Sequence, residues 1–213
     1  MKYLEIACFN APSALIAASA GADRIELCAD RSVGGTTPSL SDLEAIKAQQ
    51  VEIPVMVMIR PRGGDFVYSD EEFARMKEDM RRFRGLADGF VFGILKEEGG
   101  GGGGWGEEFG VGGVGDVAAF DYQAAVREVA KCGFRTVLTS GGIQGDVVGG
   151  HGNLPAFGEG ELVVMPGGGV RAAVLEVLVK ETNCRWFHSS GIVGEGEVVS
   201  GEEVKAMKGV LGR

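Results

Sequence analysis

Residues 24–28 read Arg-Ile-Glu-Leu-Cys, and this short run decides the class of fold. Arg24, Glu26 and Cys28 share one face of an extended chain, because the side chains of a strand point alternately to opposite faces. A parallel sheet that is covered by helices on both faces has strands that are apolar throughout. A closed barrel instead has one helix-covered face and one interior face that can carry charges toward its mouth. The alternation therefore favours an α/β protein of the TIM (β/α)8-barrel type.

The same kind of segment recurs along the chain. Apolar runs follow the ends of helices and precede turns, and they alternate with segments of helical period, which predicts parallel strands joined by helices. We expect one TIM-barrel-like domain over residues 1–213, a length that can bury a large core. The predicted strands are Tyr3–Phe9, Arg24–Cys28, Val55–Ile59, Gly89–Leu95, Thr136–Ser140, Leu162–Met165 and Arg185–Ser189.

Three of the predicted helices carry recognisable start signals. Ser41 with Glu44, and Ser69 with Glu72, both fit a capping box, in which side chains satisfy free backbone N–H groups at the helix start. Asn10 suits the cap of the helix that follows the first strand.

Composition argues against several classes of function. The formal net charge of −9 disfavours a nucleic-acid partner, which needs clustered Lys and Arg, and an anionic membrane surface. We find no signal-peptide pattern at the N-terminus and no apolar run of about eighteen residues that would span a membrane. The cysteines Cys8, Cys28, Cys132 and Cys184 are dispersed, which is typical of a reduced, cytoplasmic protein.

Motifs in both halves of the chain resemble the CutC family. The resemblance covers nearly all of residues 4–95 and returns from about 121 to 191, and its most specific motif is IRPRGGDFVY at residues 59–68. It implies a TIM-barrel fold and a role in copper homeostasis, without a defined molecular activity. The other motifs are GADRIELC at 21–28, GGTTPS at 34–39, LTSGG at 138–142, MPGGGV at 165–170 and FHSSG at 187–191.

Glycine marks where the chain departs from that family. Many of its 37 glycines lie in residues 99–115, where the family has a helix and a fifth strand with a Phe-His-Arg-Ala-Phe-Asp motif. Residues 141–160 likewise replace an expected helix. We therefore expect an incomplete barrel, with strand five missing or replaced by a Gly-rich segment. Either residues 109–117 supply a poor eighth strand, or a loop or a partner chain of a homo-oligomer covers the open edge.

Copper is the cofactor that the resemblance implies, and Cys28 is the candidate ligand. Soft Cu(I) prefers thiolate and thioether ligands, and Cys28 should face the interior near Met56 and Met58. The resemblance implies a second cysteine at position 7, but this chain has Ala7. Cys8 is one residue displaced, which turns its side chain outward. Because buried Cys and Met also serve as core packing, we expect weak or no specific Cu(I) binding by one chain.

The loops after the last two predicted strands are a candidate anion site. Gly167, Gly168 and Gly169 expose bare backbone before a helix, and barrels commonly bind phosphate through N–H groups at this place. Ser189 and Ser190 follow the last strand on the same rim. The other interpretation is a tight turn that simply needs glycine. The ligand of such a site would be a small phosphorylated or carboxylated metabolite.

Polar residues from several strand ends form a third candidate site at the barrel mouth, where barrel enzymes place their chemistry. Glu26 or His188 can serve as a general base, with Arg60 holding a substrate anion. Equally, Glu26 and Arg60 can form an internal ion pair. We expect His151, in the second glycine-rich window, to be exposed. The predicted mouth set is Glu5, Glu26, Arg60, Arg62, Asp65 and His188.

Three functional interpretations remain open. The first is a copper-homeostasis protein that binds Cu(I) through Cys28. The second is a TIM-barrel enzyme, of hydrolase, lyase or isomerase type, or an anion-binding protein for a small metabolite. The third is a protein whose glycine-rich replacements leave it without activity.

Overall fold

The computed structural model describes residues 1–94, 133–143, 145–154 and 162–212. All seven predicted strands are confirmed, most of them shortened by one or more residues at an end. They are β1 Tyr3–Cys8, β2 Arg24–Leu27, β3 Val55–Met58, β4 Gly89–Val91, β5 Thr136–Thr139, β6 Val163–Pro166 and β7 Trp186–Ser189.

The strands pair in parallel throughout the described residues. Five of them form one sheet in the order β4-β3-β2-β1-β7, and β5 pairs with β6. β6 also lies beside β7 without a paired register. The α/β class with a parallel sheet is therefore confirmed. The predicted replacement of strand five, at residues 99–115 and 109–117, lies outside the described residues.

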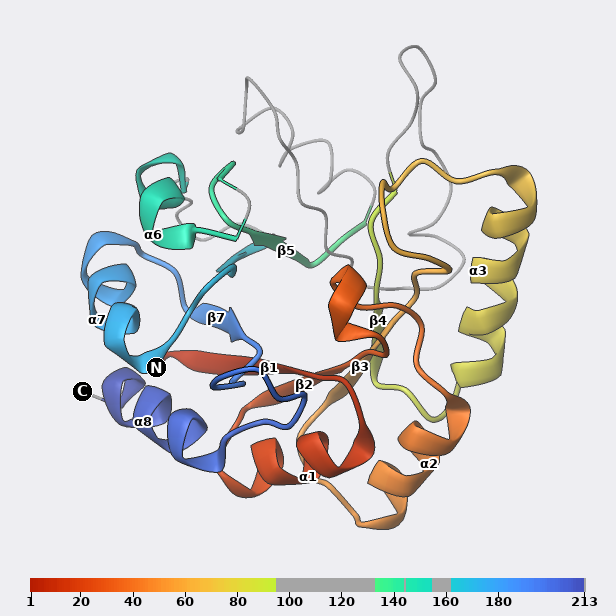
Figure 1. Ribbon diagram of the computed structural model, residues 1–213, viewed down its shortest axis with the longest axis horizontal. Coiled ribbons are helices and arrows are strands. Elements are labelled where there is room, and N and C mark those ends of the chain that lie inside the picture. Colours follow the sequence, from red (N-terminus) through yellow and green to blue (C-terminus); the bar gives the residue numbers. More distant parts are fainter. Residues whose placement is uncertain (95–132, 144, 155–161, 213) are drawn as a thin grey trace.

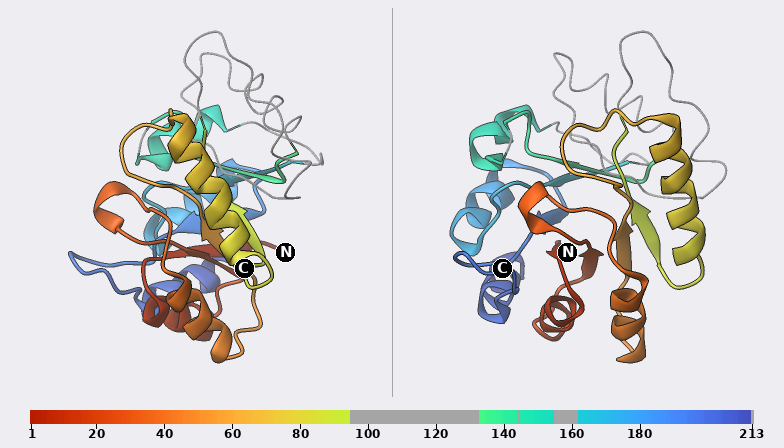
Figure 2. Two further views of the ribbon diagram at one scale, coloured as in Figure 1. Left: turned by 90° about the vertical axis from the view of Figure 1, so that its right-hand side faces the viewer. Right: turned by 45° about the vertical axis from the view of Figure 1, so that its right-hand side comes forward.

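The helices lie outside the strands as a continuous layer (Figures 1 and 2). α6 packs on α7, α7 on α8, α8 on α1 and α1 on α2, so the last helix of the chain lies beside the first. No helix in the described ranges is long and apolar enough to cross a membrane. The helices are α1 Ala11–Ser19, α2 Leu40–Ala48, α3 Asp70–Phe83, α6 Val147–Gly150, α7 Ala172–Glu181 and α8 Gly201–Leu211, with 3₁₀ turns η1 Arg31–Val33 and η2 His151–Asn153.

Two of the three predicted helix starts are confirmed. Ser69 and Glu72 form the capping box of α3, and Asn10 accepts a hydrogen bond from a backbone N–H of α1. The Ser41 prediction is wrong, because α2 begins at Leu40 and Ser39 is its cap. Both Ser39 and Ser41 are suitable cap residues. Ser39 also donates its hydroxyl to the carboxylate of Asp42, the third residue of the helix, at 2.6 Å.

The second glycine-rich window keeps a single turn of helix, α6, where we expected the helix to be replaced. Glycine is required here by close backbone approach: a Cβ on Gly141 would lie 2.1 Å from the carbonyl oxygen of Gly150. His151, which we expected to be exposed, is half-buried, and its Nδ1 contacts the Val148 carbonyl oxygen at 2.5 Å. The described part of the window is therefore packed against α7 and the loop after β6.

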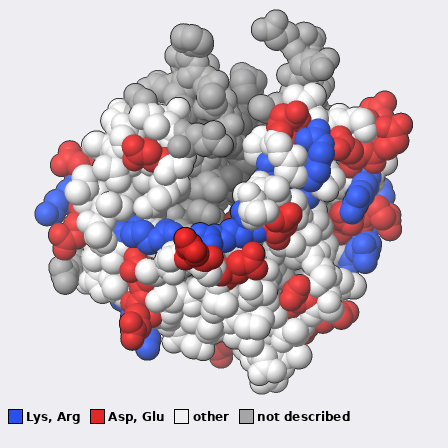
Figure 3. Space-filling view, in the orientation of Figure 1, with Lys and Arg blue, Asp and Glu red and all other residues white. Residues whose placement is uncertain are grey.

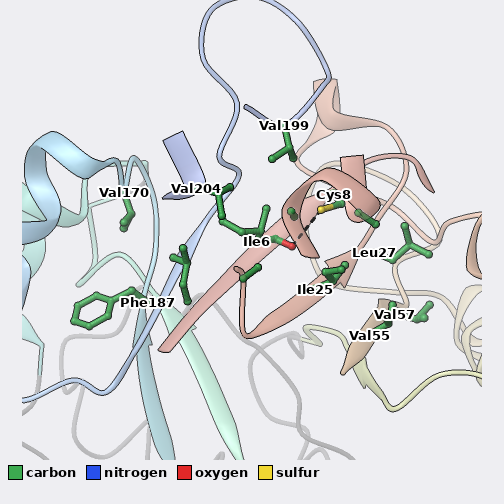
Figure 4. Close-up of a cluster of buried hydrophobic side chains, with 14 of the residues drawn as sticks. Ile6, Cys8, Ile25, Leu27, Val55, Val57, Val170, Phe187, Val199 and Val204 are labelled. Carbon is green, nitrogen blue, oxygen red and sulfur yellow. Dashed lines mark hydrogen bonds between the residues drawn. The ribbon is translucent and has the colours of Figure 1, made fainter. Parts of the chain in front are cut away.

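The predicted alternation of the strands is confirmed by what each face contacts. Leu4, Ile6 and Cys8 of β1 lie in the apolar core beneath the helices, together with Ile25 and Leu27 of β2 (Figure 4). The Cys8 thiol donates to the Ile6 carbonyl oxygen at 3.5 Å. Its side chain lies on the helix-covered face of β1, opposite the face that carries Glu5, as its position in the strand predicted. The opposite faces of the same strands are free to line a site.

Candidate functional site

A cavity of about 340 Å³ lies at the carboxyl ends of the strands. Its walls come from the ends of six strands and from the loops that follow the strands, β6 contributing through its loop alone. This is where parallel α/β proteins place ligands. The structure brings most of the predicted site residues to this one cavity. Those that line it are Glu26, Cys28, Arg60, Gly167, Gly168, Gly169, His188, Ser189 and Ser190.

Strand register gathers three charged side chains beneath the cavity. Glu5 of β1 lies opposite Arg24 of β2 on one side and opposite His188 of β7 on the other. Residues in register on neighbouring strands point to the same face. Arg24 Nε donates to one Glu5 carboxylate oxygen at 2.5 Å, and His188 Nδ1 donates to the other at 2.7 Å. Glu5, only 1% exposed, is therefore buried with both oxygens paired.

Glu26 extends this group into the cavity. It follows Arg24 by two residues on the same face of β2, so its carboxyl group comes within 3.7 Å of His188 Nε2. The imidazole of His188 thus lies between two buried carboxyl groups. Glu26 Oε1 has no hydrogen-bond partner among the described residues, although it is shielded from solvent. We call Glu5, His188 and Glu26 the carboxyl–imidazole cluster.

The pKa values within the cluster move in different directions. Burial alone would raise the pKa of Glu5, but the hydrogen bond from His188 and the charges of His188 and Arg24 outweigh it and lower that pKa. Burial raises the pKa of Glu26, and the charge of His188 only partly opposes this. Burial would lower the pKa of His188, but the Glu26 and Glu5 carboxylates raise it. Neighbouring groups whose pKa values are pushed apart are suited to acid and base roles.

The cluster can therefore hold and transfer a proton. With Glu5 ionised, the Nδ1 proton of His188 stays directed at Glu5, which leaves Nε2 on the side of Glu26, 3.7 Å from its Oε2. Glu26 lines the cavity, and its buried Oε1 has no hydrogen-bond partner among the described residues. This arrangement supports general acid–base chemistry at the cavity floor.

Arg60 takes a different role from the one that we predicted. It does not pair with Glu26, because β2–β3 register sets Glu26 opposite Met56, and Arg60 lies roughly 13 Å further along the strand direction. Its guanidinium instead donates to three backbone carbonyl oxygens at 2.8–3.1 Å and lies over the Phe66 ring at 4.5 Å. The predicted internal ion pair is wrong.

Arg62 and Asp65 lie outside the cavity, so their assignment to the mouth set is wrong. Arg62 donates to Asp65 at 3.0 Å and to Glu72 of α3 at 2.6 Å. The loop after β3 turns these side chains onto the start of α3, where Asp65 is 69% exposed at its side chain. The hydrogen bond from Arg62 lowers the pKa of Asp65. We call Arg62, Asp65 and Glu72 the surface cluster.

The glycine loop after β6 is shaped by both steric and backbone demands. A Cβ on Gly167 would lie 2.3 Å from a methyl group of Leu138 and 3.3 Å from His188. Gly168 and Gly169 adopt φ values of +96° and +78°, which side chains other than glycine rarely allow. The tight-turn interpretation therefore holds for this loop, and the loop also borders the cavity.

Arg171 is a cavity residue that the sequence analysis missed. Its guanidinium donates to the Ser189 hydroxyl at 3.1 Å and to the Ser190 hydroxyl at 3.0 Å, so these serines hold the arginine in place. A signal was present, because Arg171 occupies the N-cap of α7, where Ser, Thr, Asp or Asn is usual. Ser140 was also missed: it follows β5 directly, is 4% exposed, and its hydroxyl has no partner among the described residues.

The described residues fit resident copper poorly. Burial and the nearby Glu26 carboxylate raise the pKa of the Cys28 thiol well above its usual range, whereas Cu(I) takes the thiolate. Cys8 faces the apolar core, and Met58 but not Met56 lines the cavity. Within the described ranges no group of three His, Cys, Asp or Glu side chains is placed to hold a metal ion.

The fold and the site define a parallel α/β protein with a cavity at the carboxyl ends of its strands. The model of the CutC family matches residues 2–100. A human relative, "Copper homeostasis protein cutC homolog", is 40% identical over 88% of this chain and 72% of its own length. A "family protein CutC" of Salmonella typhi is 39% identical over 89% of this chain and 76% of its own. The chain belongs to the CutC family.

Solved structures agree with this assignment. A crystal structure titled putative copper homeostasis protein CutC, from Streptococcus agalactiae, is 28% identical with a TM-score of 0.76, and covers 89% of this chain and 99% of its own. Phosphoribosyl anthranilate isomerase from Thermus thermophilus is 17% identical with a TM-score of 0.61, over 99% and 98% of the two chains. The second likeness concerns the fold alone.

Proposed function

We propose that this chain acts in copper homeostasis through a cavity that binds a small anionic metabolite, on which Glu26 and His188 carry out acid–base chemistry. The role in copper homeostasis is supported by the names of its relatives. The chemistry is supported by the presence of Glu26 and His188 in the lining of the cavity. Reaction types open to such a site are hydrolysis, elimination and isomerisation.

The carboxyl–imidazole cluster is the observation that carries this proposal. Buried ionisable groups with displaced pKa values around a cavity are typical of acid–base sites. A purely structural ion pair would have both carboxylate oxygens satisfied, as Glu5 does. Glu26 instead keeps one shielded oxygen without a partner in the described part of the chain, which leaves it available to a ligand.

A panel of small phosphorylated and carboxylated metabolites tests the proposal by thermal shift. We expect at least one anion to stabilise the wild-type chain, and Glu26→Gln to abolish turnover of that compound while it still binds. In a host that lacks its own homologue, the wild-type chain should restore copper tolerance and Glu26→Gln should not. Failure of every anion, or full complementation by Glu26→Gln, would contradict the proposal.

Direct Cu(I) binding through Cys28 is the second candidate, favoured by one observation: its thiol and Met58 line the same cavity. A chelator competition for Cu(I) tests it with two variants, Cys28→Ser and Cys184→Ser, the latter a buried thiol outside the cavity lining. We expect weak binding in all three chains. A tight affinity that only Cys28→Ser removes would establish the copper site and overturn our expectation.

We further propose that the described strands belong to a TIM-type barrel. The continuous helical layer and the position of β6 beside β7 support closure. Hydrogen exchange tests it at both sheets: we expect slow amides in Arg24–Leu27 and in Val163–Pro166. Rapid exchange throughout both strands would mean that the core does not close.

A cytoplasmic location is proposed from the cysteines. Cys8, Cys28 and Cys184 are free and buried in the described residues, which suits a reducing compartment. Thiol counting on the unfolded chain, taken directly from cells under alkylating conditions, should find every cysteine reduced, and a stoichiometric disulfide would contradict this.

A further inference from the structure

The cavity has a positive lining in a chain whose formal charge is −9. Arg60, Arg171 and His188 border it, and Glu26 is the one carboxyl group among the described residues of the lining. Burial lowers the pKa of Arg171, as does the nearby charge of Arg31, and Glu203 only partly opposes them. Lys and Arg side chains gather in a band across the middle of one face (Figure 3). Acidic side chains adjoin this band, and among the described lining residues the two arginines outnumber the single carboxyl group.

Neither arginine of the lining is neutralised by an ion pair. Arg60 donates to three backbone carbonyl oxygens, and Arg171 donates to two serine hydroxyls and to the carbonyls of Val170 and Ile192. No carboxylate forms a salt bridge with either residue in the part of the chain that the structure describes. Buried charges are normally compensated. Among the described residues Arg60 is buried without an ion pair, and the charge of Glu203 acts on the half-buried Arg171 without forming a salt bridge.

Hydrogen-bond donors without acceptors converge beside Arg171. Ser140, which is nearly fully buried, has a hydroxyl without a partner among the described residues, and its Cβ would lie 3.3 Å from a Cβ on Gly168. Ser190 accepts from Arg171, which leaves its own hydroxyl hydrogen for another acceptor. Gly168 and Gly169 add backbone N–H groups at the same loop.

The adjacent start of α7 is not the binding point. The Ala172 N–H donates to the Glu203 carboxylate at 2.8 Å, so the first turn of the helix already has an anionic cap. An anion in the cavity would therefore sit on the loop of Gly168 and Gly169, between Ser140 and Ser190, and not on the helix end.

We propose that Ser140, Ser190, the Gly168–Gly169 loop and Arg171 bind the phosphate of a small phosphate monoester, whose organic part extends toward Glu26. This inference rests on the proposed function, and it names the class of metabolite. A phosphate brings three terminal oxygens that accept from several donors at once, which matches the hydroxyls of Ser140 and Ser190 together with the guanidinium of Arg171. A carboxylate offers one charge and two oxygens.

Titration calorimetry with glycerol 3-phosphate and inorganic phosphate tests this inference, with glycerate as the carboxylate analogue. We expect both phosphates to bind the wild-type chain more tightly than glycerate does. Ser140→Ala should weaken phosphate binding about tenfold, and Arg171→Met should weaken it more. The matched controls are Ser19→Ala and Arg82→Met, on exposed helix positions away from the cavity, and both should bind as the wild type does.

Each alternative result separates this inference from the proposed function. Binding of glycerate alone would overturn the phosphate assignment and leave the anionic-metabolite proposal standing. No binding of any anion would overturn both. Phosphate affinities that are unchanged in Ser140→Ala and Arg171→Met would place the anion elsewhere and overturn the assignment. Should Arg171→Met fail to fold, Ser140→Ala still decides, provided that its thermal unfolding matches the wild type.

Discussion

The carboxyl–imidazole cluster and the surface cluster both join carboxylates to basic side chains, but the first is buried and the second is exposed to solvent. In the first, Glu5 is fully enclosed, and register on three strands fixes its partners. In the second, Asp65 and Glu72 meet Arg62 from a loop and a helix start, and all three side chains keep contact with solvent. The sequence analysis predicted that Glu5 and Asp65 both lie at the barrel mouth, whereas the structure places Glu5 beneath the cavity and Asp65 on the surface.

The difference teaches that position relative to the strand end decides what a charged side chain does. A charge within a strand register is taken out of water and must be paired, so its removal leaves other charges exposed to a low-dielectric interior. A charge on the loop well beyond the strand, as at Arg62 and Asp65, can turn outward, where water and salt screen it. The first cluster should therefore govern stability and pH response, and the second should govern neither.

The largest expected effect follows from Glu5→Ala. This change leaves Arg24 and His188 buried without their shared carboxylate, and breaking a buried ion pair costs about 3–5 kcal/mol of unfolding free energy. Urea unfolding at pH 7 measures it. A loss below about 1 kcal/mol would mean that the cluster is not the buried network described above.

Measuring the unfolding free energies of the wild type and Glu5→Ala at acidic pH provides a control for this prediction. The pKa of Glu5 is lowered in the folded chain, so its contribution to stability is present above the unfolded value of about 4.5 and is lost as the pH falls through the folded value. The stability difference between wild type and Glu5→Ala should therefore shrink in acid, and a difference that grows there would contradict the assigned direction.

A smaller effect is expected from His188→Gln, and it depends on pH. The pKa of His188 is raised in the folded chain by the carboxyl groups of Glu26 and Glu5, against burial and the charge of Arg24. Its contribution is fully present below its unfolded pKa of about 6.5 and is lost as the pH rises through the folded value. Unfolding free energies measured from neutral to alkaline pH should show the wild-type advantage narrowing. A constant difference would argue against a charged His188.

The smallest expected effect is that of Asp65→Ala in the surface cluster. Exposed ion pairs are screened by solvent, so we expect the urea midpoint to stay within experimental error, at low and at high salt. A shift comparable to that of Glu5→Ala would remove the distinction between the two clusters.

Sequence periodicity predicted the strands well, because side chains on a strand alternate and parallel strands have no other plausible connection than a helix. Alternation also placed Glu26 and Cys28 in the interior and turned Cys8 outward. The predicted ion pair of Glu26 with Arg60 was wrong, because the sequence indicates the face on which a residue lies but not its position along the strand relative to the neighbouring strand. Register supplies that position, and it matches Glu5 with His188 across 183 positions.

The loops were harder to predict for a related reason. Ser140 stands out because its buried hydroxyl has no partner among the described residues. Arg171 stands out because its guanidinium donates to serine hydroxyls and forms no salt bridge among the described residues. Neither property can be read from the sequence, because both depend on the surrounding contacts. The Arg at the N-cap of α7 was the one available sign. Residues Gly167–Gly169 were predicted to form either an anion-binding loop or a tight turn. The structure shows a tight turn whose backbone conformation and close contacts require glycine.

A proton titration of His188 tests the central claim most directly, because the chain holds only two histidines. NMR of histidine-labelled protein, with His151→Gln to assign the second signal, would follow the imidazole in the folded state. We expect a pKa above the usual value of about 6.5, which falls in Glu26→Gln when that carboxyl charge is removed. A His188 pKa at or below that usual value, unchanged in Glu26→Gln, would contradict the existence of the carboxyl–imidazole cluster.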